Sequence, residues 1–325
     1  MADKTAAASK LESRKKLKDA GAFRGRRPKA ADRAAALGPF TALDTPQIRA
    51  ALALDGAVRL PRVRPGEWLA EQEERGQSFR SFGRRSVKIA PHGPFTTIGL
   101  VPLGDKHSWG ELADDRLLPA LAALCTAYFG RDVALLPHLL LAAMAAVEPS
   151  GAAAAEGAPA SGVVVAETEQ LLANRITAYL SSREFRKDLP RGIFATMAVS
   201  MADLTIEKDG ELWNYVFGQA SLMDGVGAFS FYRYQDENED EAGGDGSGGG
   251  GHEEERYRRL LLRSAKVLVH ELGHILGLRH CIYFQCRMNG HNSLEEADAS
   301  PLFCCPVCLR KVYISYKDPS LYAES

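Results

Sequence analysis

The chain has 325 residues and a hydrophobic fraction of 46%, enough for one sizeable domain with tails or for two small domains. Because the chain starts with polar and charged residues, we expect no secretory signal, and its longest apolar runs are too short to cross a bilayer. The net charge is −1, but residues 1–36 carry a balance of +7, which leaves −8 for the remainder. We therefore expect a protein of the cytoplasm or nucleus, where clustered thiols favour zinc over disulfides.

Residues 1–36 contain eleven lysines and arginines and almost no large apolar side chains, which predicts a disordered basic arm. This arm is either a solubilising tail or a nuclear-localisation or nucleic-acid patch around residues 24–27. Residues 37–80 follow as a variable N-terminal segment that includes a Pro- and Arg-rich piece, and no function is evident for it from the sequence.

Residues 81–325 alternate between strand-like and helical patterns, which is typical of an α/β fold. The predicted strands cover residues 87–89, 97–101, 133–136, 194–204, 216–220 and 228–234. The predicted helices cover residues 114–129, 169–180 and 253–276. Low-complexity stretches at residues 148–162 and 236–251, the second with seven glycines in its last nine positions, predict flexible insertions.

The helix predicted over residues 253–276 carries the motif H-E-x-x-H, with His270 and His274 four residues apart. Residues at this spacing lie on one helical face, one turn apart, so both imidazoles are able to share a metal ion. Glu271 lies beside the first histidine, where it is placed to take a proton from a metal-bound water.

Gly277 follows His274 by three residues, and His280 follows Gly277 by three more. Glycine permits a left-handed helix end, so the chain is able to turn sharply there and return His280 as a third ligand. Three histidines leave one zinc position open for water, which is the layout of a catalytic site.

Five of the six cysteines follow this motif, and they include two pairs with metal-ligand spacing. Cys281 and Cys286 form the first pair, and Cys305 and Cys308 form a C-x-x-C. Two such pairs bring four thiolates to a tetrahedral zinc with no open position, so that site would be structural. A disulfide pair or a redox C-x-x-C is the alternative, and Cys304 is a possible substitute for Cys305.

H-E-x-x-H-x-x-G-x-x-H followed by a methionine is the metzincin pattern. The variant found here, in which a cysteine directly follows the third histidine and C-x-M and C-x-x-C come later, resembles the archaemetzincin family. The matching residues are His270, Glu271, His274, Gly277, His280, Cys281, Cys286, Met288, Cys305 and Cys308.

This resemblance implies a metzincin-like α/β catalytic domain with a mixed sheet, an active-site helix and a zinc-clipped C-terminal segment. It implies two zinc ions, one catalytic on the three histidines and one structural on the four cysteines. Glu271 would be the general base and Met288 the Met-turn. The activity implied is peptide-bond hydrolysis, with aminopeptidase action as one candidate mode. Because His280 and Cys281 are adjacent, we predict that the thiolate site positions His280.

The expected partner is a peptide or protein substrate that lies along an edge strand by strand addition. The segment 216–220 precedes the helix at a suitable distance and is similar to a family segment, so Gly218 is our candidate for substrate binding. We expect a monomer that binds no membrane and contacts nucleic acid only if the basic arm does so.

Two other interpretations stay open. The first is a zinc-stabilised binding or adaptor protein with a vestigial peptidase site, although all three histidines and Glu271 are intact. The second is a peptidase whose third zinc ligand is a downstream carboxylate, Glu295 or Glu296.

Overall fold

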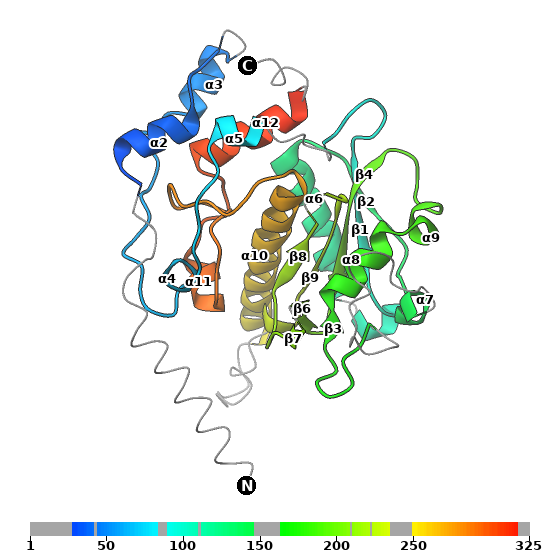
Figure 1. Ribbon diagram of the computed structural model, residues 1–325. Helices are drawn as coiled ribbons and strands as arrows, with labels where there is room; N and C mark the ends of the chain where they lie inside the picture. The colour runs from blue at the N-terminus through cyan, green and yellow to red at the C-terminus, as the bar shows by residue number, and fades with distance from the viewer. Residues whose placement is uncertain are drawn as a thin grey trace. The chain divides into compact units, whose positions relative to one another are not determined.

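The computed structural model describes residues 28–41, 44–83, 90–109, 112–145, 163–208, 210–221, 223–234 and 249–317 (Figure 1). The chain forms two compact units. Unit 1 combines Met1–Arg85 with Leu278–Tyr313, and unit 2 combines Ser86–Gly277 with Ile314–Ser325. Residues 1–27 of the predicted arm, the insertion predicted at 148–162, the strand predicted at 87–89 and residues 236–248 lie outside the described residues.

Unit 2 is built on a mixed five-stranded sheet in the order β2-β1-β4-β9-β8. Its strands are β1 (Thr97–Pro102), β2 (Val133–Leu135), β4 (Ile193–Ser200), β8 (Gly218–Ala220) and β9 (Val226–Ser230). The strands β2, β1, β4 and β9 are parallel, whereas β8 pairs with β9 in the antiparallel sense. The predicted α/β class with a mixed sheet is thus confirmed.

The central strand β4 reads IFATMAVS, and its last six residues are buried. An almost continuous apolar run is typical of a parallel strand that is covered on both faces. Ala198 on β4 and Ala228 on β9 are directly opposite and pack in the hydrophobic cluster that includes Ile176 and Leu180 of helix α8 (Ala173–Ser181). Helix α10 (Gly249–Ile275) contacts β9, β8 and β4 and packs beside α6 (Leu118–Phe129), and in Figure 1 it lies on the other side of the sheet from α8.

Several shorter elements complete unit 2. They are η1 (Lys106–Trp109), η2 (Leu112–Leu117), α7 (Leu141–Ala145), β3 (Leu171–Leu172), α9 (Arg183–Arg186), β5 (Leu204–Thr205), β6 (Glu207–Lys208), β7 (Glu211–Leu212) and η4 (Tyr232–Tyr234). None of the helices in the described part of the chain combines the length and apolarity that a bilayer-spanning segment needs.

The structure differs from the sequence-based elements at their boundaries. The helix predicted over 114–129 begins as a π-helical turn and becomes α-helical at Leu118, where Pro119 lacks the N–H that a continuing helix would use. The helix predicted over 169–180 begins only at Ala173, because Leu171 and Leu172 pair with β5. The strand predicted over 228–234 ends at Ser230 and continues as η4.

Unit 1 consists of short helices joined by loops. They are α2 (Ala30–Leu37), α3 (Pro46–Ala51), α4 (Trp68–Glu71), α5 (Phe79–Gly83), α11 (Leu294–Ala299) and the part of α12 (Pro306–Lys317) up to Tyr313. With short helices and long loops, unit 1 also depends on specific polar contacts between buried groups for its stability.

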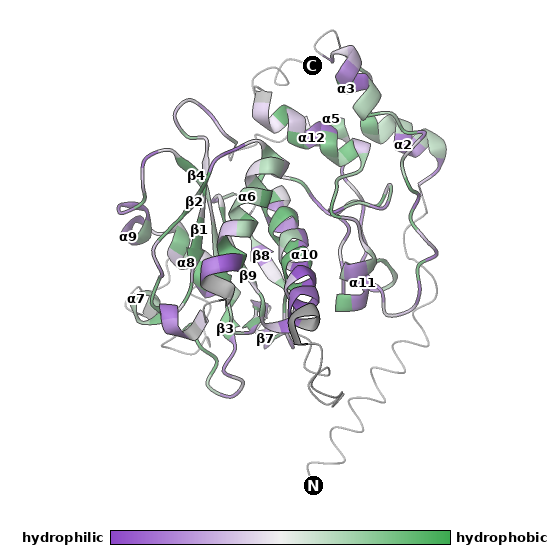
Figure 2. Ribbon diagram, turned by 180° about the vertical axis from the view of Figure 1, so that it is seen from behind, coloured by the Kyte–Doolittle hydropathy of each residue, from purple (hydrophilic) through white to green (hydrophobic). Residues whose placement is uncertain are grey.

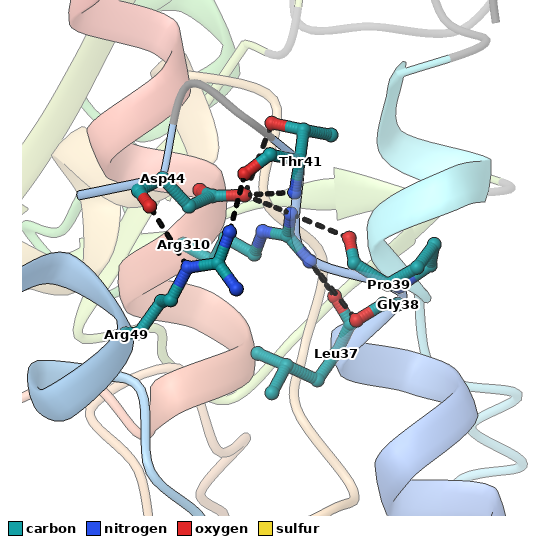
Figure 3. A network of polar contacts seen from close by, with 7 residues as sticks. All are labelled: Leu37, Gly38, Pro39, Thr41, Asp44, Arg49 and Arg310. Atoms are coloured by element: carbon teal, nitrogen blue, oxygen red, sulfur yellow. Dashed lines mark hydrogen bonds and ion pairs between the residues drawn. The ribbon is translucent and has the colours of Figure 1, made fainter. Parts of the chain in front are cut away.

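Arg310 on α12 is fully buried, and its guanidinium holds the end of α2 (Figure 3). It donates to the carbonyl oxygens of Leu37, Gly38 and Pro39 at 2.7, 3.1 and 2.8 Å. The last carbonyls of a helix have no partner within the helix, and a cation there is favourable. Arg310 therefore satisfies the end of α2 from a position more than 270 residues along the chain.

Asp44 supplies the counter-charge for Arg310, at 3.0 Å from the guanidinium, with 0% and 2% of the two side chains exposed. The same carboxylate oxygen accepts from the backbone and the hydroxyl of Thr41 at 2.6 and 3.1 Å. Arg49 donates to the backbone carbonyls of Asp44 and Thr41 from the surface (Figure 3). One oxygen of the buried carboxylate thus accepts hydrogen bonds from both Arg310 and Thr41.

We expect Arg310→Met to destabilise the protein by about 3–5 kcal/mol, because it leaves the buried Asp44 carboxylate without its cation. The measurement is the free energy of unfolding from urea titration. Arg49→Met is the matched control, and an exposed arginine should contribute at most about 1 kcal/mol. Equal destabilisation by the two substitutions would contradict this role for Arg310.

Candidate zinc sites

Helix α10 changes character along its length, from hydrophilic in its first half to largely hydrophobic in its second (Figure 2). All residues from 263 to 273 are buried. Leu268, Leu272 and Ile275 have at most 2% of their surface exposed. These apolar residues recur at helical spacing and anchor the second half of α10, which holds His270 and His274 in fixed positions.

His270 and His274 face each other on α10 with their Nε2 atoms 3.0 Å apart. The two rings meet edge to face, with centroids 4.6 Å apart. Two imidazole nitrogens at this distance repel each other unless they share a proton or a cation. The pair therefore has the donor chemistry of a metal site, as the sequence spacing predicts.

Glu271 is 6% exposed and lies against the backbone of the edge strand β8. A Cβ atom at Gly218 would stand 3.0 Å from both the Cγ and the Oε1 of Glu271, and 3.0 Å from the carbonyl oxygen of Ala228. The absence of a side chain at Gly218 thus leaves room for the carboxylate. The structure brings together two residues, Glu271 and Gly218, that the sequence analysis named for separate roles.

Gly277 ends the helical run with φ of +89°, a conformation that favours glycine. Its N–H donates to the carbonyl of His274 at 2.8 Å, which closes the last turn. The predicted left-handed helix end is therefore confirmed in the backbone. The first stretch of unit 2 ends at this residue, and unit 1 resumes at Leu278.

His280 lies in unit 1, where its Nδ1 is 2.7 Å from Oε1 of Glu74. The same oxygen accepts a hydrogen bond of 2.9 Å from the indole Nε1 of Trp68. The Trp68 ring also meets the imidazole edge to face, with centroids 5.0 Å apart. Neither partner can be predicted from the sequence, because both lie more than 200 positions earlier in a segment without a recognisable motif.

Cys281, Cys286, Cys305 and Cys308 form a buried group in unit 1, and their Sγ atoms all lie within 4.8 Å of one another. The Sγ atoms of Cys281 and Cys305 are 3.6 Å apart. Four thiols at this separation match the donor set of a tetrahedral zinc. Cys304 is half-buried and is not part of this group.

Burial and mutual hydrogen bonding polarise the four thiols. Hydrogen bonds from Cys286, Cys305 and Cys308 hold the pKa of Cys281 well below its usual range. The pKa of Cys305 is raised by burial and by Cys281, and that of Cys308 is raised chiefly by its hydrogen bond with Cys281. A divalent cation bound by the four sulfurs would replace thiol protons, because thiolates are the form that binds a metal.

The backbone near Cys286 donates hydrogen bonds to its sulfur, which stabilises negative charge there. The N–H groups of Met288 and Cys305 donate to Sγ of Cys286 at 3.4 and 3.2 Å. Met288 is fully buried, and its carbonyl accepts from the N–H of Cys281 at 2.7 Å. By contrast, burial alone raises the pKa of the isolated Cys125 to about 12, as expected for a small core residue.

The carboxylate of Glu296, one of the two alternative zinc ligands, has structural partners in unit 1. Its oxygens accept from the backbone N–H of Asn292 at 2.8 Å and of Trp68 at 3.2 Å. These contacts join α4 to the start of α11. They give Glu296 a role in organising the loops of unit 1.

Comparisons with known proteins identify the family of this chain. A sequence profile of peptidase family M54 matches residues 253–313. Archaemetzincin-2 of Homo sapiens is 33% identical over 264 residues, which cover 76% of this chain and 67% of the human protein. The chain belongs to the archaemetzincin family. It is therefore a zinc-dependent metallopeptidase, and the resemblance drawn from the sequence is confirmed.

Other archaemetzincins are more distant. Archaemetzincin-1 of Homo sapiens is 26% identical over 267 residues, which cover 77% of this chain and 49% of that protein. The crystal structure of archaemetzincin from Methanopyrus kandleri is 20% identical, with coverage of 69% of this chain and 97% of that one and a TM-score of 0.46. The malonate complex of the Archaeoglobus fulgidus protein is 23% identical, with coverage of 66% and 99% and a TM-score of 0.43.

We expect Gly218→Ala to lower peptidase activity about tenfold or more and to destabilise the protein by about 1–3 kcal/mol, as overpacking does. The added methyl group would meet both Glu271 and the carbonyl of Ala228, so either the carboxylate or β8 must move. Steady-state kinetics and thermal unfolding measure the two effects. Gly56→Ala is the control, because a Cβ atom there has no neighbour within 4 Å. Full activity in Gly218→Ala would contradict the close approach.

Proposed function

We propose that this archaemetzincin hydrolyses peptide bonds at a zinc ion held by His270, His274 and His280, with Glu271 as general base. The observation that carries the proposal is the arrangement on α10. Two histidines there have facing Nε2 atoms, and the buried carboxylate of Glu271, between them in sequence, lies against the edge strand. The spacing of His280 after the left-handed Gly277 supports its assignment as the third ligand.

The zinc, when bound, would polarise the scissile carbonyl and acidify water. Glu271 accepts the proton of the attacking water and returns it to the leaving amine, as a general base and then a general acid. The burial of Glu271 beside β8 keeps its carboxylate in one position for both transfers. His270 and His274 hold their rings in place through the buried stripe of α10.

We further propose that the substrate peptide adds to β8 as an extra strand. Among the described residues β8 is an outer strand of the sheet. Ser221 donates to Val226 and Phe217 accepts from Ser230, so alternate residues of β8 direct their backbone groups toward β9. Gly218 and Ala220 therefore direct their N–H and C=O groups outward, where an extended peptide would pair with them.

The four buried cysteines would hold a second, structural zinc. Their thiols already lie close together, and Sγ of Cys286 accepts two backbone N–H groups, so little rearrangement is needed to bind a cation. Four sulfur ligands leave no place for water or substrate, so this ion would stabilise unit 1 without taking part in hydrolysis.

We expect Glu271→Gln to lower kcat by about 10²–10⁴-fold while the bound zinc stays at the wild-type level, because a neutral amide cannot accept the proton. Hydrolysis of a peptide library and metal analysis of the same samples provide the two measurements. Wild-type turnover in this variant would refute the assigned base. A zinc-loaded wild-type protein that cleaves no peptide would instead favour a binding protein with a vestigial site.

We expect two zinc ions per chain in the wild-type protein and one in His274→Ala. Cys308→Ser should lose the structural zinc and, with it, about 3 kcal/mol or more of stability, because metal binding energy contributes directly to folding. Elemental analysis with thermal unfolding measures both quantities. A single zinc in the wild-type protein would contradict the proposal of two sites.

The mode of cleavage is tested by comparing each peptide with its N-acetylated form. An aminopeptidase requires a free terminal amine, whereas strand addition along β8 also allows internal cleavage. Equal rates for the two forms would exclude the aminopeptidase mode that the family resemblance suggests.

A further inference from the structure

Residues 74–77, here called the 74–77 loop, pack against the segment that contains His280. Gly76 has φ of +68°, and a Cβ atom there would stand 2.8 Å from Cγ1 of Ile282 and 2.9 Å from the hydroxyl of Tyr283. The side-chain oxygen of Gln77 accepts from the backbone N–H of Arg279 at 3.2 Å. The approach is so close that only glycine fits, and it joins two stretches that are about 200 residues apart in sequence.

Glu74 makes the central contact of this loop, at 2.7 Å from Nδ1 of His280. A carboxylate accepts hydrogen bonds, and an indole N–H only donates. Oε1 of Glu74 therefore receives one hydrogen bond from Trp68 and one from His280, whose proton must be on Nδ1. Nε2 of the neutral imidazole then keeps its lone pair, which is the form that binds a metal.

Trp68 fixes the position of this carboxylate and of the ring. Its backbone N–H donates to Glu296, and its indole fills a space beside Gly290, where a Cβ atom would stand 2.5 Å from Cδ1. The indole edge also contacts the His280 ring. With one hydrogen bond and one ring contact, the imidazole is restrained in both tautomer and orientation.

We propose that Glu74 is a positioning residue for the third zinc ligand, holding His280 as the Nδ1–H tautomer with its ring oriented by Trp68. This inference rests on the proposed function, in which His280 binds the catalytic zinc. It assigns a task to the segment 37–80, for which the sequence offered none. Carboxylate partners of metal-binding histidines typically change metal affinity by about 10- to 100-fold when they are removed.

The test measures zinc affinity by competition with a chelator in the full-length protein. We expect Glu74→Ala to weaken the zinc at the histidine site by about 10- to 100-fold while the zinc on the cysteines stays bound. Glu74→Gln keeps an oxygen acceptor without the charge, so it should regain part of the affinity. Glu73→Ala is the matched control, because that neighbouring side chain is 67% exposed.

The tautomer of His280 provides a second readout, which a purely structural role for Glu74 would not change. Nitrogen-15 NMR of the imidazole should show the proton on Nδ1 in the zinc-free wild-type protein and a mixture of tautomers in Glu74→Ala. Unchanged zinc affinity and tautomer in a folded Glu74→Ala variant would overturn the inference. If Glu74→Ala does not fold, wild-type affinity in Glu74→Gln would overturn it instead.

The same experiment separates this inference from the proposed function. If the wild-type protein binds no zinc beyond the thiolate ion, the proposed function fails. If it binds a second zinc whose affinity is insensitive to Glu74, only the role of Glu74 fails.

Discussion

The left-handed turn at Gly277, directly after α10, is the constraint on which the proposed chemistry depends. An α-helix rises about 1.5 Å per residue, so a continuing helix would carry residue 280 roughly 9 Å beyond His274 along the axis. Gly277 avoids this outcome by adopting φ of +89°, a conformation that L side chains rarely take. At this one glycine the chain thus changes from the helix that carries His270 and His274 to the loop that carries His280 and the cysteines.

Unit 1 reaches its fold by means other than a large apolar core. Its buried groups include the Arg310–Asp44 pair, which satisfies the end of α2, and the four clustered thiols. Each of these is costly to bury unless its partners are in place, so they specify one arrangement of loops that could otherwise pack in several ways. Because Cys281 of the thiol cluster is the chain neighbour of His280, the position of the cluster also restrains the backbone of His280.

Local sequence chemistry predicted the features that depend on short spacings. The helical face shared by His270 and His274, the left-handed turn at Gly277 and the four-cysteine group all involve residues whose positions follow from helix geometry or familiar ligand spacing. The family resemblance, which the relatives confirm, follows from the same short motif. The α/β class followed from the alternation of strand-like and helical patterns, whereas the mixed sheet followed from the family resemblance.

The remaining features could not be predicted, because they depend on contacts between distant segments. Leu171 and Leu172 fit a helical pattern but extend to pair with β5, since a buried parallel bridge outweighs weak local propensity. Glu74 lies in a polar stretch with no periodicity, and only the tertiary fold brings it to His280, 206 positions away. No spacing rule identifies such a partner in a single sequence.

The construction of unit 1 from two separate stretches has a consequence for how such proteins are recognised and dissected. A fragment that starts after residue 85 would retain every residue of the signature motif, yet it would lack the 74–77 loop, Trp68 and the partners of Arg310. The motif therefore identifies only the later of the two stretches that build unit 1. Across relatives, divergence in the early segment would remodel the surroundings of His280 while leaving the diagnostic pattern intact.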